Sequence, residues 1–212
     1  MKAFIDDLQV ALSGVLPGVE AQYRMAHGSR RNKLGVPLNA RKAGVLALFY
    51  PRADEWHLVF IERVRNAKDR HSGQISFPGG GYDETDGNLA RTALRETEEE
   101  IGVSAQQIEL IGSLSELYIP VSNYLVHPYV GFMEKAPSFT PEVAEVASIV
   151  QTPFRTFLND DNVIEGTLKV NPNFTLKDVP FYQVEDKVIW GATAMMMSEL
   201  VSVVKRESIL LP

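Results

Sequence analysis

Four carboxylates stand within the five residues from Glu96 to Glu100, and this crowding is the strongest chemical signal in the chain. Like charges four residues apart on a helix repel one another, so a cation is expected to compensate them. Hard divalent ions take oxygen ligands, and Mg²⁺ in particular is held by one or two carboxylates together with substrate phosphates. A run of acids is also typical of a solvated helix face, so the carboxylates alone leave both interpretations open.

The segment that carries these acids predicts one helix over residues 89–101. Asn88 is a good N-cap residue, and Gly102 suits the position just beyond the last turn. At about 100° per residue, the acids and the apolar residues fall on different sides of this helix. The acidic side carries Glu96, Glu99 and Glu100, and the expected buried side carries Ala90, Leu94, Thr97 and Ile101.

The stretch from Gly79 to Val103 resembles the signature of the Nudix hydrolases, in which a glycine and an acid precede Arg-Glu-U-x-Glu-Glu-x-Gly-U, with U apolar. The acid of the first half stands one residue out of register, at Asp86, and this departure recurs in the branch of the family that hydrolyses coenzyme A. The residues that match in register are Arg95, Glu96, Glu99, Glu100, Gly102 and Val103, with Thr97 at the first U.

Two further segments resemble the coenzyme A pyrophosphatase branch. Before the acidic helix, His71, Gly73, Gln74 and the run 77–80 match the motif that precedes it there. Asp69 stands where that motif has an arginine, and the spacing from Arg63 is one residue longer. Residues 189–194 (IWGATA) match a later segment, so the resemblance spans roughly residues 43–204.

The resemblance implies an α/β/α sandwich with a mixed sheet and a metal-dependent hydrolase. The implied metal ligands are Glu96, Glu99, Glu100 and the Gly79 carbonyl, which would hold roughly one to three Mg²⁺ or Mn²⁺ ions. Arg95, four residues before Glu99, is expected to orient the carboxylates. A later acid of the family is matched by Glu145, with Glu142 in reserve.

The group that removes a proton from the attacking water is left open between Glu100, Glu145 and a hydroxide on the metal. His127 is another candidate base, although a lone histidine beside a proline is more often structural. The implied catalytic residues are therefore Arg95, Glu96, Glu99, Glu100 and Glu145.

Basic side chains crowd residues 63–73, just before the acidic stretch. Beside an acidic metal site, such groups can bind an anionic substrate through charge-assisted hydrogen bonds. A solvated basic loop is the alternative interpretation. The candidate substrate-binding residues are Arg63, Arg65, Lys68, Arg70 and His71.

Composition indicates an ordinary globular protein of 212 residues, with 45% hydrophobic and 23% charged residues. The net charge of −6 argues against a surface that coats nucleic acid. There is no cysteine, which excludes disulfides, thiolate metal sites and a cysteine nucleophile. Asp6 and Asp7 interrupt the apolar N-terminal stretch, and no run of about 18 apolar residues exists, so we expect a cytoplasmic protein without a membrane span. A homodimer is compatible with these features.

The expected organisation is an N-terminal helix and basic arm over residues 1–42, a Nudix hydrolase domain over 43–204, and a tail over 205–212. The first helix covers Phe4 to Leu12, and the segment Ala21–Lys42 is expected to be irregular. A turn is expected at 79–81. Predicted strands are 43–50, 57–62, 74–77, 108–116, 124–134, 143–151 and short ones within 163–184. A short helix is expected at 152–158, and the stretch 188–197 is expected to run into an apolar helix that continues through Val204.

The leading function is hydrolysis of a nucleoside diphosphate linked to another moiety, X. Coenzyme A or an acyl derivative is the best single substrate that the resemblance implies, giving adenosine 3′,5′-bisphosphate and 4′-phosphopantetheine. The alternatives are a dinucleotide or an oxidised nucleotide as substrate, or a Nudix module that only senses a nucleotide.

Overall fold

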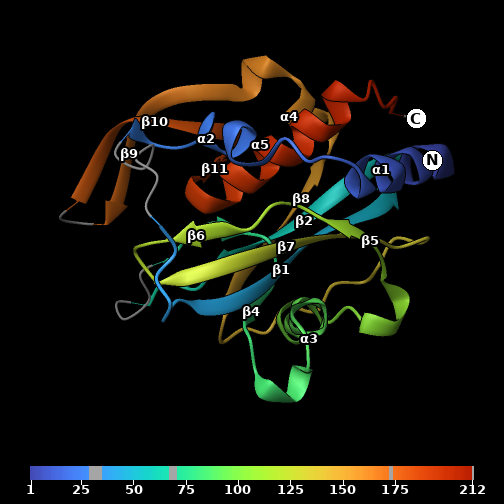
Figure 1. The fold of residues 1–212 in the computed structure, drawn as a ribbon, viewed down its shortest axis with the longest axis horizontal. Helices are drawn as coiled ribbons and strands as arrows, with labels where there is room; N and C mark the ends of the chain where they lie inside the picture. Colours follow the sequence, from blue (N-terminus) through green and yellow to red (C-terminus); the bar gives the residue numbers. More distant parts are fainter. Residues whose placement is uncertain (29–34, 67–70, 172–173, 212) are drawn as a thin grey trace.

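The computed structural model describes residues 1–28, 35–66, 71–171 and 174–211 (Figure 1). The helices are α1 (Lys2–Ser13), α2 (Gly18–Tyr23), α3 (Leu89–Ile101), α4 (Arg155–Leu158) and α5 (Gly191–Arg206), with 3₁₀ turns η2 (Glu84–Asp86), η3 (Ala105–Gln107) and η4 (Asp160–Asn162). The strands are β1 (Arg41–Arg52), β2 (Glu55–Arg63), β3 (Ile75–Ser76), β4 (Gly79–Gly81), β5 (Glu109–Ser113), β6 (Leu117–Ile119), β7 (Tyr124–Phe132), β8 (Val146–Pro153), β9 (Val163–Asn171), β10 (Phe174–Val184) and β11 (Lys187–Trp190).

The layers form an α/β/α sandwich, which confirms the predicted fold class. Helix α3 covers one face of the larger sheet, and α1, α2 and α5 cover the other (Figure 1). Two apolar clusters fill the two sides. The cluster beneath α5 contains Phe49, Phe60 and Phe77, and the smaller cluster above α3 contains Leu46 and Ile101.

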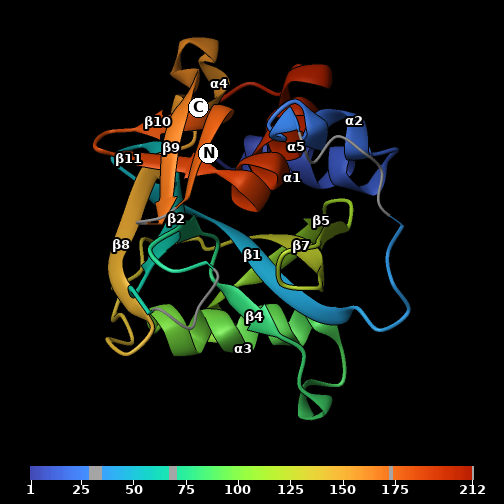
Figure 2. The same ribbon diagram turned by 90° about the vertical axis from the view of Figure 1, so that its left-hand side faces the viewer.

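The larger sheet is mixed, because β1 pairs in parallel with β7 and antiparallel with β2 and β4. Its strand order is β3-β2-β1-β7-β5, with β4, β6 and β8 paired to β1, β7 and β2 in turn. The first half of β1 pairs with β4 and its second half pairs with β2, so these two strands follow one another along β1. A separate three-stranded sheet of order β11-β10-β9 lies on the α5 side (Figure 2).

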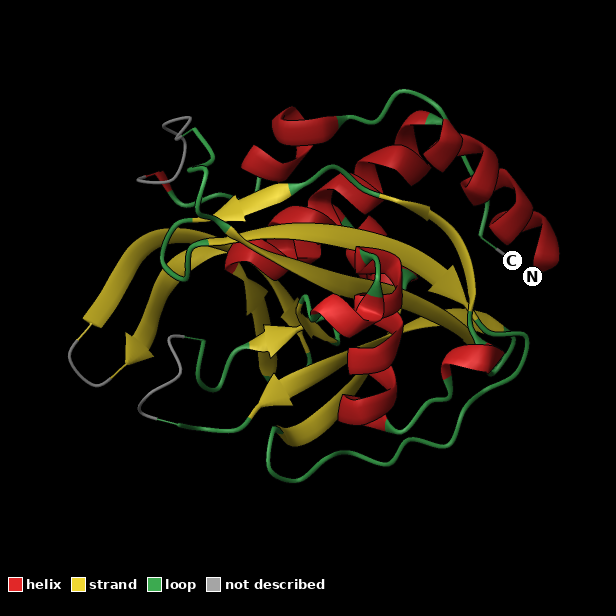
Figure 3. Cartoon of the chain, turned by 60° about the horizontal axis from the view of Figure 1, so that its bottom comes forward, coloured by secondary structure: helices red, strands yellow, loops and turns green. Residues whose placement is uncertain are grey.

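Helix α3 begins and ends where its caps predict. The Asn88 side chain accepts a hydrogen bond from the Arg91 amide at 2.9 Å, and Gly102 closes the helix with φ of 71°. The predicted division of its faces is wrong in one respect: Glu100 is buried, at 2% exposure, rather than on a solvent-facing acidic side. Helix α3 lies across one face of the sheet (Figure 3), and its buried stripe carries Thr92, Ala93 and Thr97.

The predicted glycine turn at 79–81 is a strand, β4, that pairs with residues 43–45 of β1. Glycine has low strand propensity, which explains why the pattern did not indicate a strand. The reason for glycine at this position is steric. A Cβ at Gly79 would overlap the Gly44 carbonyl, so glycine is required for β4 to lie this close to β1.

Several other predicted boundaries need correction. Residues 18–23 form α2 rather than the start of an irregular arm, and residues 163–184 form two long strands rather than several short ones. The predicted helix at 152–158 is a single turn, α4, because Thr152 belongs to β8. The first helix, the apolar helix α5 and most other strands lie where the sequence predicts them.

Glu199 of α5 fastens the N-terminal segment to the core. This carboxylate is fully buried and accepts hydrogen bonds from the Gly18 amide at 3.0 Å, from Gln22 Nε2 at 2.9 Å and from the Ser115 amide at 3.2 Å. The contacts join α2 and the segment after β5 to α5.

The division into an arm, a Nudix domain and a tail at residues 42 and 204 stays a prediction.

The contact between α3 and β1 depends on Gly44, because a Cβ there would overlap the Leu89 carbonyl. We predict that Gly44→Ala lowers the free energy of unfolding by about 2 kcal/mol, since the helix must shift to make room. The matched control is Gly28→Ala, where a Cβ meets nothing within 4 Å. Urea denaturation followed by circular dichroism measures both, and equal midpoints for the two variants would contradict the prediction.

Candidate active site

Arg95 and Asp86 form the central ion pair of the site. Arg95 Nε lies 2.7 Å from Asp86 Oδ1, and Nη2 lies 3.1 Å from Oδ2. Asp86 is 5% exposed and also accepts hydrogen bonds from Thr92 Oγ1 and the Asp83 amide. These bonds, above all those from Arg95, hold the pKa of Asp86 well below its usual range. The acid that is out of register in the sequence therefore binds the arginine of the motif directly.

The same guanidinium contacts two acids of its own helix. Arg95 Nη2 lies 2.9 Å from Glu96 Oε1, and Nη1 lies 2.9 Å from Glu99 Oε2. Nη2 also donates to the Gly81 carbonyl at 3.2 Å. One arginine thus connects η2, β4 and α3, which is the arrangement expected of a residue that orients the carboxylates.

Glu96 presses its carboxylate against Gly80 of β4. A Cβ at Gly80 would overlap that carboxylate, so the approach requires glycine. The Glu96 side chain is 17% exposed, and its burial raises the pKa of the carboxyl while Arg95 opposes the rise.

Glu100 is the most buried acid of the site. Its Oε2 accepts a hydrogen bond from the Gly79 amide at 2.9 Å, and its Oε1 lies 3.7 Å from Arg63 Nη1. Burial raises its pKa to about 7, and the nearby charges of Glu96 and Glu145 add to this effect. A carboxyl that titrates near neutrality is suited to exchanging a proton.

The structure distinguishes the two later acids. The charge of Glu145 acts on Glu96 and Glu100, and its backbone carbonyl accepts a hydrogen bond from the Val64 amide at 2.8 Å. Glu142 instead accepts a hydrogen bond from the Ala144 amide within its own turn. Glu145 is therefore the later acid whose charge acts on the carboxylates of α3, and its catalytic role stays a prediction.

The predicted basic residues divide into three groups. Arg63 and His71 line a pocket beside β4, and His71 Nδ1 lies 3.3 Å from Gln74 Oε1. Arg65 is exposed and packs beside Gly73 instead. Lys68 and Arg70 lie outside the described residues.

The candidate base His127 contacts Glu116, with His127 Nδ1 3.2 Å from Glu116 Oε1, and burial lowers the pKa of this histidine.

The pocket has a volume of about 560 Å³, which is in the usual range for a small-molecule site. It lies on the α5 side of β4, so Gly79 and Gly80 form a wall that touches the pocket on one side and the carboxylates on the other. Sequence reasoning did not find most of its lining, because these residues come from α5 and from strands that lie far apart in the sequence. The lining residues that it missed include Val170, Phe174, Leu176, Trp190, Met195 and Met196.

Three consecutive methionines of α5 have two roles. Met195, Met196 and Met197 are all buried in the core. Met195 and Met196 also line the pocket, together with Val170 of β9 and Leu176 of β10. This second role depends on the tertiary fold, because β9, β10 and α5 lie apart in the sequence.

The donor chemistry suits a hard divalent cation, since the acids of α3 offer oxygen atoms alone. Within the described part of the chain, no three acidic or histidine side chains already stand in a ligating arrangement. Glu96 and Glu99 are instead paired with Arg95. A cation at this place would take over carboxylate oxygens that the guanidinium holds in the described arrangement.

Comparisons with known proteins identify the family of the chain. A family model described as the NUDIX domain matches residues 40–155. The chain is 35% identical, over 61% of its length, to the uncharacterized Nudix hydrolase NudL of Photorhabdus laumondii, of which it covers 68%. It is 32% identical, over 73% of its length, to the peroxisomal coenzyme A diphosphatase ndx-8 of Caenorhabditis elegans, of which it covers 64%.

A solved structure shows the same fold at low sequence identity. The Nudix hydrolase RenU of M. smegmatis superposes with a TM-score of 0.55 and 15% identity, over 79% of this chain and 87% of that one. The chain belongs to the Nudix hydrolase family and is a pyrophosphohydrolase. The resemblance to this family, and to relatives named for coenzyme A diphosphatase activity, is confirmed.

The Arg95–Asp86 pair generates a stability prediction. Asp86→Asn leaves buried donors without their charged partner, so the free energy of unfolding at pH 7 should fall by about 2 kcal/mol. The exposed neighbour Glu84→Gln is the control and should stay near wild type.

The contribution of Asp86 to the free energy of unfolding depends on pH in a defined direction. The folded-state pKa of Asp86 is lowered, so its contribution is complete above the unfolded value of about 4 and is lost as the pH falls below it. Urea denaturation at pH 7 and pH 3 should show a difference between wild type and Asp86→Asn that shrinks at pH 3. A difference that is equal at both pH values would contradict the assignment.

Proposed function

We propose that the chain hydrolyses the diphosphate bond of a nucleoside diphosphate linked to another moiety, X, with coenzyme A or its acyl derivatives as the best single substrate. The main support for this proposal is the wall formed by Gly79 and Gly80. These two glycines contact the crowded carboxylates and also line a pocket of substrate size. A relative named as a coenzyme A diphosphatase supports the choice of substrate.

Glu96, Glu99 and Glu100, with the Gly79 carbonyl, would hold Mg²⁺ or Mn²⁺. Such ions neutralise a diphosphate and lower the pKa of a water that attacks phosphorus. Arg95 positions the carboxylates through its contacts with Glu96 and Glu99.

Arg63 stands where the pocket meets Glu100 and is placed to bind a phosphate oxygen. Lys68 and Arg70 stay predicted phosphate ligands, as do Arg65 and His71. The proton of the attacking water passes to a group near the wall, and Glu100 and Glu145 are the two protein candidates.

The reaction balances as a hydrolysis. The oxygen of water forms a bond to one phosphorus, and the bridging P–O bond to that phosphorus breaks, leaving a phosphate on each fragment. From coenzyme A the products are adenosine 3′,5′-bisphosphate and 4′-phosphopantetheine.

A dinucleotide is the second candidate substrate, because Tyr124, Phe174 and Trp190 bring aromatic rings to the pocket that could stack on a second base. A substrate panel of coenzyme A, a diadenosine diphosphate and an oxidised nucleotide separates these possibilities. A module that only senses nucleotides is disfavoured, because binding alone does not require four crowded acids.

The remaining expectations concern the setting of the protein. No helix in the described ranges is long and apolar enough to cross a membrane. One relative is named as peroxisomal, so the expected cytoplasmic location stays a prediction. Two further expectations also stay predictions: that the protein has no nucleic-acid partner and that it forms a homodimer.

Glu100→Gln tests the catalytic assignment. The substitution keeps the shape of the side chain and removes its charge, so kcat should fall by about 10²-fold or more at saturating Mg²⁺ while the fold survives. Glu98→Gln is the matched control, since Glu98 is exposed on the same helix and contacts the Ala105 amide instead. Near-normal turnover of coenzyme A by Glu100→Gln would place the chemistry elsewhere.

A further inference from the structure

We infer that the β9–β10 hairpin and the start of α5 form a binding site for an apolar, uncharged part of moiety X, such as the acyl chain of a thioester. The inference rests on the proposed function and names the part of the substrate that the far end of the pocket receives.

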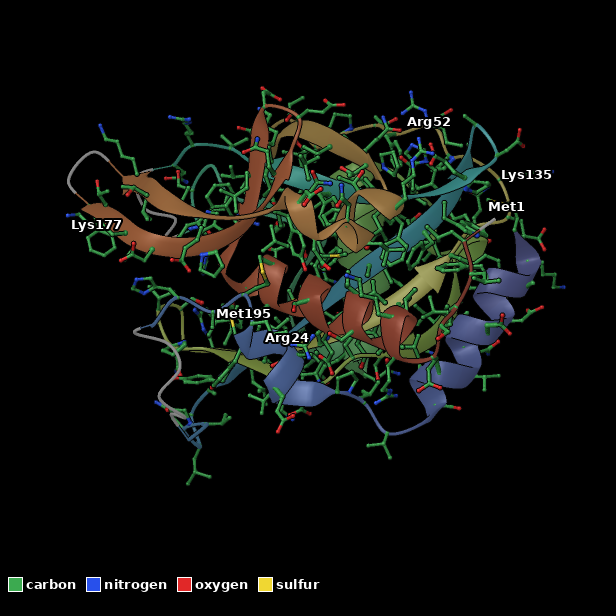
Figure 4. The ribbon with its side chains drawn as sticks, turned by 90° about the horizontal axis from the view of Figure 1, so that it is seen from above. Met1, Arg24, Arg52, Lys135, Lys177 and Met195 are labelled. Atoms are coloured by element: carbon green, nitrogen blue, oxygen red, sulfur yellow. The ribbon has the colours of Figure 1, made fainter. Side chains whose placement is uncertain are left out.

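The far wall of the pocket is built from apolar side chains. The hairpin contributes Val170, Phe174, Leu176 and Val179, and α5 contributes Met195 and Met196. Figure 4 shows Met195 at the start of α5 and Lys177 on the hairpin, which extends beyond that helix end. Unbranched methionine side chains adapt their shape to a flexible chain, which suits a site for an alkyl group.

Charge is distributed unevenly along the pocket. Among the described lining residues, Arg63 carries a full charge at pH 7, and it lies beside Gly79, at the end next to the carboxylates. The residues that the hairpin and α5 contribute to the lining are uncharged. A phosphate group is therefore accommodated at the Arg63 end, and an uncharged group at the hairpin end.

Phe174 is 51% exposed although it lines the pocket. A large aromatic side chain at a pocket mouth gains free energy when a ligand covers it. His27 Nε2 lies 3.1 Å from the Lys177 carbonyl of β10. The strand that carries the exposed Phe174 ring therefore contacts the N-terminal segment.

This wall lies outside the part of the chain that the family model matches. The match ends at residue 155, whereas the hairpin and α5 follow it. Gly79, Gly80 and the acids of α3 lie inside the match. The shared segment thus supplies the hydrolytic end of the pocket, and the later segment selects moiety X.

The test compares kcat/KM for coenzyme A and octanoyl-coenzyme A, which share the same diphosphate and nucleotide. Each buried methylene is worth roughly three- to fourfold in binding, so wild type should prefer the octanoyl thioester by about tenfold or more. Phe174→Asp and Leu176→Ala should reduce this preference by about tenfold and about threefold respectively. Thr175→Asp is the matched control, because Thr175 is exposed on the same strand and does not line the pocket.

A wild type that treats the two substrates equally would overturn the inference, as would variants that keep the full preference. Binding separates this failure from failure of the proposed function. Octanoyl-coenzyme A and coenzyme A are titrated into metal-free protein by calorimetry. Tighter binding of the octanoyl ligand, lost in Phe174→Asp, supports the site even where a dinucleotide is the substrate that is cleaved, and equal binding of the two ligands contradicts it.

Discussion

The guanidinium of Arg95 contacts Asp86, Glu96 and Glu99 at once, and the arrangement of the site depends on this set of ion pairs. Asp86 precedes the helix, and Gly81, whose carbonyl also accepts from Arg95, ends β4. The arginine therefore fixes the helix, the turn before it and the glycine strand relative to one another. Asp86 is buried, so loss of Arg95 would leave its charge without its main partner inside the protein. Arg95 is 31% exposed and would keep Glu96 and Glu99 as partners if Asp86 were lost.

Close approach through glycine is the second constraint. Gly44 admits the start of α3 onto β1, and Gly79 and Gly80 admit β4 between β1 and the carboxylates. A side chain at Gly44 or Gly79 would meet backbone atoms and separate layers that must touch, whereas one at Gly80 would displace the Glu96 carboxylate. The result is a wall one strand thick, with acids on one side and an apolar pocket on the other. The proposed hydrolysis and the recognition of moiety X can then act on different parts of one ligand.

Sequence reasoning recovers the helix over 89–101 because its caps and its spacing are local signals. It recovers the α/β/α class through the family resemblance, which rests on a motif of fixed spacing. It places Glu100 on the wrong side, because periodicity gives the angles between residues but not the rotation of the helix against the sheet. It misses β4, since three glycines give no strand signal, and it misses the far wall of the pocket, whose residues meet only through the packing of β9, β10 and α5.

We propose that the acids of α3 hold a divalent cation, which shares their negative charge with Arg95. Thermal unfolding across a Mg²⁺ titration tests this proposal most directly, because an ion that binds only the folded state stabilises it by RT ln(1 + [L]/Kd). We predict a Tm that climbs through the millimolar range in wild type and rises much less in Glu96→Gln/Glu100→Gln. An unchanged wild-type Tm, or an equal climb in the double variant, would contradict the account.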